Sequence, residues 1–203
     1  MNKSTSVYID PSARPMPQEK RKRNGQATKE AILEAGLRAF CEHGYDGVGL
    51  REIARAAGVT AVLVNRYYGT KEDLFSAAVD AAFGGDSPFS GDITTLATRF
   101  AKLLVAKTQH REGGPDGLLL LLRSAANPRA AEILKKAIEK SFAAPLQSRL
   151  EGESADLRAA LFLAQIAGFQ LMSQMIRLDA LNKAGARRLA MLLARMFEQQ
   201  LLV

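Results

Sequence analysis

The sequence is poor in several residue types: among its 203 residues it has one cysteine, two histidines and no tryptophan. A lone cysteine excludes an intramolecular disulfide, so Cys41 is expected to be an ordinary buried thiol in a reducing compartment. No apolar run approaches the ~20 residues that span a bilayer, and residues 1–17 lack the continuous apolar core of a secretory signal. These absences predict a cytoplasmic protein that does not use a membrane as a partner.

The side chains that usually carry catalysis are also scarce. The two histidines, His43 and His110, lie far apart in the sequence and lack the spacing of metal ligands. The chain has no glycine-rich phosphate-binding loop and no cluster of metal-binding residue types. We therefore predict that the protein is not an enzyme and that it has no metal site and no cofactor.

Positive charge is in excess but is unevenly distributed. The net charge is +7, and residues 1–25 carry six basic and two acidic side chains, residues 26–75 six and seven, and residues 76–203 sixteen and twelve. Such an excess attracts nucleic acid or an anionic membrane equally well. The segment 26–75 can bind DNA only if the placement of its basic residues compensates for its net negative charge.

Residues 1–25 contain three prolines and the run EKRKRNG, without an apolar period. This composition predicts a disordered basic arm. The arm is either a solvated tail without a role or, if the protein binds DNA, a segment that contacts phosphates or the minor groove.

Apolar residues recur at helical spacing over the rest of the chain, and no segment shows the alternation of a strand. The fold class is therefore all-α, with about nine helices and a glycine- and proline-marked joint at 84–92. The first helix is expected to begin at Thr28, and Pro145 could break one of the later ones. The other expected helices lie at about 50–57, 60–67, from 70 on, 92–109, 116–126, 128–150, 155–179 and 184–202.

The short helix at 60–67 has two different faces. At 100° per residue, one arc of roughly 140° holds Ala61, Val62, Asn65 and Arg66. The opposite face holds Leu63, Val64 and Tyr68, which can pack on Ile53, Ala54 and the first helix.

Gly58 can form the turn before this helix, which gives a helix-turn-helix pattern. In a major groove, Asn pairs with adenine, Arg with guanine, and the methyl groups of Ala61 or Val62 can contact thymine. A structural helical hairpin with a few polar surface residues is the alternative.

Three neighbouring residues are candidates for phosphate contacts. Tyr67 lies at the edge of the arc, and Thr60 can cap the helix. Lys71 occupies the first turn of a helix opened by Thr70, with Asp73 as a weak form of the capping box. A cation there opposes the helix dipole, but a phosphate would be bound by both the lysine and the free backbone N–H groups.

The segment LREIARAAGVTAVLVNRYYGTKEDLF (50–75) resembles the signature of the TetR family of transcriptional regulators, and the resemblance extends over about residues 28–75. It implies a helix-turn-helix domain over 26–75, followed by a ligand-binding and dimerisation domain over 76–203. It also implies that Ala61, Val62, Asn65 and Arg66 face bases or sugars, and that Val64 and Tyr68 lie in the core. Tyr67, Lys71 and Thr28, the last at the start of the first helix, would hold phosphates.

The sequence departs from the family pattern at several positions. Gly49 stands where the family usually has a Ser or Thr that caps the second helix, so that position offers no side-chain oxygen. Asn65 replaces a common tyrosine, and Val62 with Leu63 replaces a frequent Gly-Thr pair. The operator sequence therefore cannot be inferred from a relative.

The segment 155–179 is apolar on two sides, so it needs two partners. One stripe contains Leu157, Leu161, Ala164, Gly168, Leu171, Met175 and Leu178, and the other contains Phe162, Ile166, Phe169 and Ile176. With the similar helix 184–202, it predicts a homodimer through a four-helix bundle, as in TetR-like proteins. A monomeric core helix is the alternative.

The resemblance also implies a small-molecule effector of unknown identity inside the larger domain. The candidate lining residues are Phe100, Leu103, Leu104, Leu119, Leu122, Phe142, Phe162, Phe169 and Met172, with the polar side chains of Arg123, Gln165 and Gln170. Ordinary core packing is the alternative for each, and Arg123 is expected to pair with Glu132 or Asp156 rather than with a ligand. The predicted protein is a dimeric, ligand-responsive DNA-binding regulator, a repressor in preference to an activator. The rival is a helical ligand-binding or membrane-surface protein without sequence-specific DNA binding.

Overall fold

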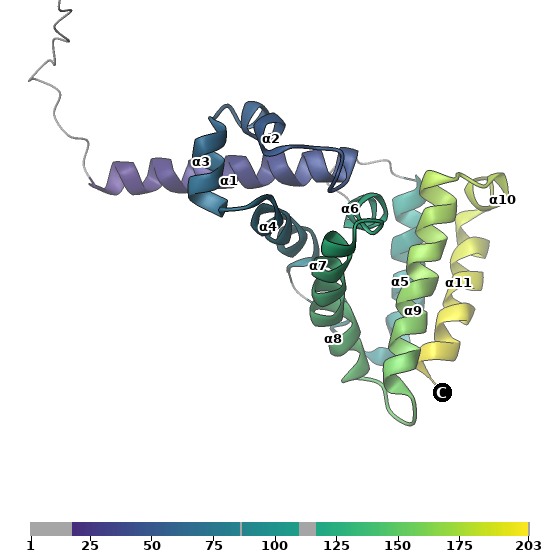
Figure 1. Ribbon diagram of the computed structural model, residues 1–203. Coiled ribbons are helices and arrows are strands. Elements are labelled where there is room, and N and C mark those ends of the chain that lie inside the picture. Colours follow the sequence, from purple (N-terminus) through teal and green to yellow (C-terminus); the bar gives the residue numbers. More distant parts are fainter. Residues whose placement is uncertain (1–17, 86, 110–116, 203) are drawn as a thin grey trace, which may run out of the picture.

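The computed structural model describes residues 18–85, 87–109 and 117–202, and every regular element in these ranges is a helix (Figure 1). The all-α prediction is confirmed. The elements are α1 (Gln18–His43), α2 (Leu50–Ala56), α3 (Ala61–Tyr68), α4 (Lys71–Phe83), α5 (Ile93–Gln109), α6 (Gly117–Ser124), α7 (Pro128–Ile138), η1 (Glu139–Ala143), α8 (Ala144–Gln147), α9 (Ala155–Gln170), η2 (Leu171–Met175), α10 (Asp179–Asn182) and α11 (Ala186–Leu201).

Helix α1 begins earlier than expected. It starts at Gln18 instead of Thr28, so the prediction of a disordered arm is wrong for residues 18–25, and residues 1–17 lie outside the described residues. The stretch QEKRKRN is rich in strong helix formers, and extending an existing helix avoids the cost of nucleation. The start of α1 projects past α3 in Figure 1.

A first hydrophobic core joins α1–α4 to α6 and α7. Phe40, Tyr45 and Phe75 form its aromatic centre, with ring centroids 5.0 Å apart for Phe40–Phe75 and for Tyr45–Phe75. Leu120 of α6 and Leu134 of α7 are buried in the same cluster. Helix α4 crosses the expected domain boundary at 75/76, and the core of the N-terminal domain continues into the larger domain.

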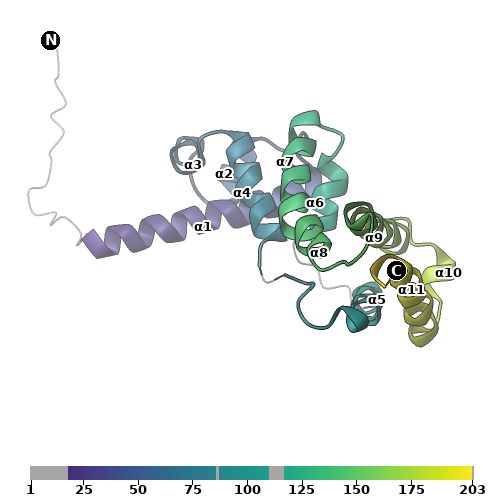
Figure 2. The ribbon, with the colours of Figure 1, turned by 90° about the horizontal axis from the view of Figure 1, so that it is seen from below.

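A second core lies among α5, α8, α9 and α11. Helices α5, α9 and α11 run side by side in two views related by 90° (Figure 1, Figure 2). The ring of Phe162 is fully buried between Phe100, at a centroid distance of 5.4 Å, and Phe197, at 4.9 Å. Apolar burial on this scale holds the three helices together.

Two π-helical segments interrupt the later helices. Segment η1 precedes Pro145, which lacks an N–H group and would crowd the carbonyl four residues earlier in a regular α-helix. The break expected near Pro145 therefore takes the form of a π-turn. Segment η2 follows Gln170 and shifts the register, because a π-turn holds more residues than an α-turn. As a result Ile176, expected on one stripe with Phe162, is 59% exposed, whereas Phe162 is fully buried.

Candidate DNA-binding interface

The turn between α2 and α3 is built by backbone hydrogen bonds around Gly58. The Gly58 N–H donates to the Arg55 carbonyl oxygen at 3.1 Å, and the Val59 N–H donates to that of Ala54 at 2.9 Å. Gly58 has a φ of +67°, which a glycine adopts without the strain of a side chain. Ala54 is buried and small, so α3 can cross close to α2. The sequence prediction of a helix-turn-helix at this place is correct in its geometry.

Helix α3 is anchored on one face. Val64 is buried, and the Tyr68 hydroxyl donates to the Lys29 carbonyl oxygen of α1 at 2.9 Å. Burial, followed by the charge of Glu30, raises the pKa of Tyr68, which keeps the hydroxyl protonated as a donor. Leu63, expected to pack here too, is only half-buried and lies outside the core cluster. Ala61, expected on the outward arc, and Tyr67, expected at its edge, are instead half-buried and pack against the core.

The outward face of α3 carries side chains that the rest of the molecule does not use. Val62 is 77% exposed, and Asn65 and Arg66 are exposed as well. Within the described ranges, neither Asn65 nor Arg66 makes a side-chain hydrogen bond or an ion pair. An exposed aliphatic side chain beside two free hydrogen-bonding groups is suited to the edges of bases in a major groove.

The structure modifies the expected phosphate contacts. Thr28 lies inside α1, and its hydroxyl donates to the Asn24 carbonyl oxygen at 2.7 Å, so the implied position at the helix start is wrong. Tyr67 is half-buried against α1, where its hydroxyl lies 3.3 Å from the place of a Cβ at Gly25. Thr60 occupies the N-cap position of α3 without a side-chain cap bond, which leaves its hydroxyl available.

Lys71 contacts an aromatic ring. Its Nζ atom lies 4.6 Å from the centroid of the Tyr45 ring, a cation–π contact. This contact balances a cation in the first turn of α4, where the dipole alone would disfavour it. The ammonium group has no ion-pair partner within the described ranges and retains its charge for a phosphate.

The starts of α2 and α4 are capped in different ways. At Gly49, the backbone N–H donates to Glu52 Oε2 at 2.7 Å, and no side-chain oxygen is present, as expected. At Thr70, the hydroxyl accepts from the Asp73 N–H at 3.1 Å and the Asp73 carboxylate accepts from the Thr70 N–H at 2.9 Å. The Thr70 hydroxyl also donates to the Asp73 carboxylate at 2.6 Å, and this bond, together with the one from the Thr70 N–H, lowers the pKa of Asp73. The predicted capping box at Thr70 is therefore confirmed.

The acidic and basic side chains of residues 26–75 differ in their contacts. Every acidic side chain in this segment has a partner: Glu30 with Gln26, Glu34 with Arg38, Glu42 with His43, Asp46 with Asn127, Glu52 with Gly49, Glu72 with Arg129 and Asp73 with Thr70. Of these acids, Glu34 and Glu72 are paired with arginine, whereas Gln26, Asn127, Gly49 and Thr70 are neutral partners. Among the Lys and Arg side chains of the segment, Arg38 alone pairs with a carboxylate within the ranges that the structure describes. The remaining cations of this segment are left to attract an external anion.

Sequence reasoning missed two of these cations, Arg51 and Arg55 of α2. Both are exposed and have no ion-pair partner within the described ranges. The first helix of a helix-turn-helix crosses the DNA backbone, so basic residues on it are candidates for phosphate contacts. Their spacing of four residues, which places both on one face of α2, was the available signal.

The candidate ligand residues are only partly brought together. Five of them share the second core: Phe100, Leu104, Phe142, Phe162 and Phe169. Leu119 and Leu122 are half-buried on α6 outside that core, and Met172 is 40% exposed. Leu103 is exposed as well. Gln165 has a buried Oε1 without a hydrogen-bond partner in the described part of the chain.

Arg123 has a different role from the expected one. Its Nη1 atom donates to the carbonyl oxygens of Cys41 and Glu42, at 2.6 and 2.7 Å, instead of pairing with Glu132 or Asp156. These carbonyls end α1, where a cation is favoured by the helix dipole. Arg123 therefore joins α6 to α1 and does not line the apolar core.

Helices α9 and α11 each bury one face and expose another. Phe162 and Phe197 are fully buried in the second core, whereas a set of large apolar side chains remains exposed. This set, called the α9–α11 face below, contains Leu157, Leu161, Met172, Met175 and Ile176 from α9–η2 and Leu192 and Met196 from α11. Exposed apolar surface of this kind marks an interaction site.

Comparisons with known proteins agree with this geometry. The family profile described as "Tetracyclin repressor-like, C-terminal domain" matches residues 95–201, and that of "Bacterial regulatory proteins, tetR family" matches residues 32–78. The regulatory protein RaaS of Mycobacterium tuberculosis is 53% identical over 49 residues, or 24% of this chain and 23% of that protein. The regulator AcrR of Shigella flexneri is 42% identical over 57 residues, which are 28% of this chain and 26% of that protein. The matched part of the chain thus spans about a quarter of these curated relatives.

Solved structures resemble the whole chain. A TetR-family regulator from Streptomyces coelicolor is 25% identical, with 87% of this chain and 95% of that chain covered and a TM-score of 0.54. NalD, described as the secondary repressor of the MexAB-OprM multidrug efflux pump in Pseudomonas aeruginosa, is 21% identical, with 85% and 96% covered and a TM-score of 0.61. In the ranges that the structure describes, no helix is long and apolar enough to cross a membrane, and no group of acidic, His or Cys side chains could hold a metal.

Proposed function

Since the chain belongs to the TetR family of transcriptional regulators, we propose that it binds a two-fold symmetric DNA operator as a homodimer and represses transcription until a small molecule releases it. The observation that carries this proposal is the free outward face of α3. Val62, Asn65 and Arg66 are exposed there, and Asn65 and Arg66 make no side-chain hydrogen bond or ion pair within the described ranges. Arg51, Arg55, Lys71 and the Thr60 hydroxyl would contact phosphates around them.

The dimer forms through the α9–α11 face. One recognition helix reads only a few base pairs, so specificity requires two of them about one helical turn of DNA, roughly 34 Å, apart. Burial of seven large apolar side chains on each protomer favours association. The separation of the two α3 helices then controls the affinity for DNA.

The effector binds within the larger domain, next to the aromatic cluster of Phe100, Phe142 and Phe162. The unpartnered Oε1 of Gln165 supplies a polar group for an otherwise apolar guest. A ligand acts as a switch only if it binds one arrangement of the dimer better than the other. We assign the protein to the cytoplasm and give it no catalytic role.

Selection of binding sites from random duplexes tests this function. The purified full-length protein would be used at about 100 mM salt, where phosphate contacts alone bind weakly. We expect a two-fold symmetric site whose recovery is lost on Asn65→Ala. Lys136→Ala serves as the control, because Lys136 is an exposed residue of α7 paired with Glu132.

Binding that is salt-sensitive, equal for all duplexes and unchanged by Asn65→Ala and Arg66→Ala would favour the rival helical binding protein. A copurified effector could also abolish recovery of a site. Repeating the selection after refolding from denaturant separates these outcomes, because refolding restores the site only in the second case.

A further inference from the structure

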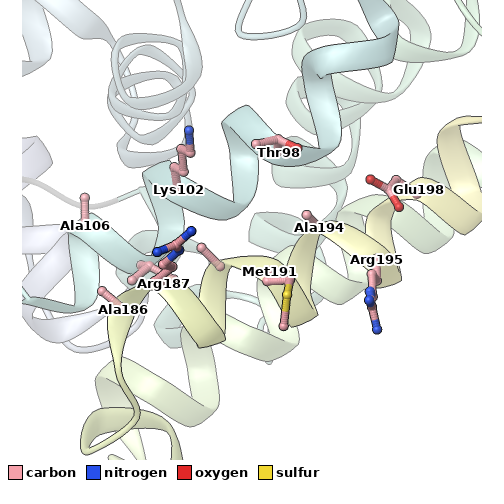
Figure 3. Close-up of a pocket in the computed structure, with 11 residues that line it drawn as sticks. Thr98, Lys102, Ala106, Ala186, Arg187, Met191, Ala194, Arg195 and Glu198 are labelled. Carbon is pink, nitrogen blue, oxygen red and sulfur yellow. The ribbon is translucent and has the colours of Figure 1, made fainter.

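A groove runs between α5 and α11 on the surface of the larger domain (Figure 3). It has a volume of about 620 Å³, within the range of small-molecule sites. Its floor is formed by small side chains, among them Ala190 and Ala194, because two helices that meet through alanines leave space beside the contact. Lys102 and Arg187 lie toward one end of the groove, and Thr98 and Glu198 lie toward the other.

The two helices carry an unusual concentration of positive charge. Helices α5 and α11 hold six basic residues, Arg99, Lys102, Lys107, Arg187, Arg188 and Arg195, and a single acidic one, Glu198. Three exposed cations on other helices lie opposite an acid one turn away, in the pairs Arg38–Glu34, Lys136–Glu132 and Lys183–Asp179. Neither Lys102 nor Arg187 has such a partner in the described ranges. Two unpaired cations at one end of an apolar groove are complementary to an anionic head group.

The groove is separate from both surfaces assigned above. Ala190 and Ala194 point to one side of α11, whereas Leu192 and Met196 of the α9–α11 face point to the opposite side, given 100° per residue. The aromatic cluster lies beneath α5 and α9, and none of its rings lines the groove. A dimer through the α9–α11 face therefore leaves the groove uncovered.

We propose that this groove binds an amphiphile with a single carboxylate head. The head pairs with Arg187, whose guanidinium matches a carboxylate bidentately, and with Lys102. The apolar chain lies over Ala190, Ala194 and Met191. From Ala186 to Glu198 the groove extends along α11 for about 18 Å at 1.5 Å per residue. At the far end Arg195 and Glu198 carry opposite charges (Figure 3), so that end has no excess of positive charge to hold a second anion. The site thus selects one anionic end and a linear apolar body.

Methionine methyl NMR of the full-length protein with dodecanoate as the probe tests this site. Met191 lines the groove, and Met172, Met175 and Met196 lie on the α9–α11 face, so the methyl signals report the two surfaces separately. We expect a saturable shift of the Met191 methyl group alone. The double variant Lys102→Gln/Arg187→Gln should weaken binding about tenfold or more.

The matched control is Lys107→Gln/Arg188→Gln, which removes the same charge from the same two helices outside the groove. It should leave the affinity within about twofold. Unchanged Met172 and Met196 signals in the first variant would show that its fold is intact. The readout involves no DNA, so the result of this test does not depend on the proposed repressor function.

Several outcomes would overturn the proposal. Dodecanoate could shift Met172 and Met196 without Met191, which would place it on the α9–α11 face. Equal binding of dodecanol or dodecyltrimethylammonium would show that the cations do not recognise the head. Retained affinity in the Lys102→Gln/Arg187→Gln variant would have the same meaning. A Met191 shift that depends on protein concentration alone would assign the groove to a second copy of the chain.

Discussion

At the scale of single residues, the DNA contacts proposed for the side chains around α3 divide into contacts with bases and contacts with phosphates. Arg66→Ala should cost about 1–3 kcal/mol of binding to the selected operator and relax the preference at one base pair, because a bidentate contact carries sequence information. Lys71→Ala should weaken binding to all duplexes and reduce the slope of log K against log salt by about 1. Fluorescence anisotropy titrations at several salt concentrations measure both effects. An equal loss on operator and random DNA for Arg66→Ala would contradict a base contact.

The capping box of α4 gives a residue-scale prediction about pH. The pKa of Asp73 is lower in the folded protein than its ordinary value, because Thr70 donates to the carboxylate. A carboxyl group with a depressed folded pKa stabilises the protein above its unfolded pKa, and this contribution is lost as the pH falls through the folded pKa. The Tm of the wild type should therefore exceed that of Asp73→Asn at neutral pH, and the difference should shrink below the ordinary aspartate pKa.

Thr70→Ala removes the hydroxyl group that accepts from the Asp73 N–H in the same capping box. It should lower the free energy of unfolding by about 1 kcal/mol at neutral pH. Thr60→Ala is the matched control, since Thr60 also occupies an N-cap position but makes no side-chain cap bond. Equal destabilisation by the two substitutions in urea titrations would contradict the role given to the Thr70 hydroxyl.

At the scale of elements, hydrogen bonds join the end of α6 to the end of α1 and the residues that follow it. Ser124 Oγ accepts from the Tyr45 N–H at 3.0 Å, and a Cβ on Gly44 would lie 2.3 Å from the Arg123 carbonyl oxygen. Arg123→Met keeps the stem but removes the donors to Cys41 and Glu42. We expect a loss of about 1 kcal/mol in stability and faster amide exchange at the end of α1, measured by hydrogen-exchange mass spectrometry. Arg129→Met, which removes only the exposed pair with Glu72, should change exchange in α1 little.

The basic stretch at the start of α1 gives a second element-scale prediction. Replacing Lys20, Arg21, Lys22 and Arg23 by glutamine should reduce non-specific DNA affinity and lower the salt slope by about 0.9 for each phosphate that is no longer neutralised. The sequence preference found by selection should be unchanged, because phosphate contacts carry no base information. An unchanged salt slope would assign this stretch to a tail without a role.

Local signals explain which elements the sequence predicts well. Gly58, Gly69 and the joint at 84–92 mark the helix ends, and the wheel of 60–68 correctly separates Val64 from Asn65 and Arg66. The start of α1 and the shift at η2 were missed, because neither leaves a turn signal in the sequence. The partner of Arg123 was also missed, since it is set by how α6 packs on α1, about 80 residues away in sequence. Periodicity alone cannot report such a contact.

At the scale of the whole molecule, the α9–α11 face is the proposed dimer interface. Leu161→Lys combined with Leu192→Lys should convert the dimer to a monomer in light-scattering measurements, because two buried cations per protomer cannot be paired. The affinity for the two-fold operator should fall with it. Leu103→Lys is the control, since Leu103 is 53% exposed on α5 and outside this face. A double variant that remains dimeric would place the interface elsewhere.

The shared first core also limits how this protein can be recombined with others. Leu120, Ala130, Leu134 and Ala137 of α6 and α7 are buried against α1–α4, and Arg129 pairs with Glu72 across the same contact. A DNA-reading segment excised at the joint 84–92 would expose this apolar surface and lack part of its core. A hybrid protein that takes its DNA specificity from this chain should therefore include residues 117–138 together with α1–α4. The transferred segments are then not continuous in the sequence.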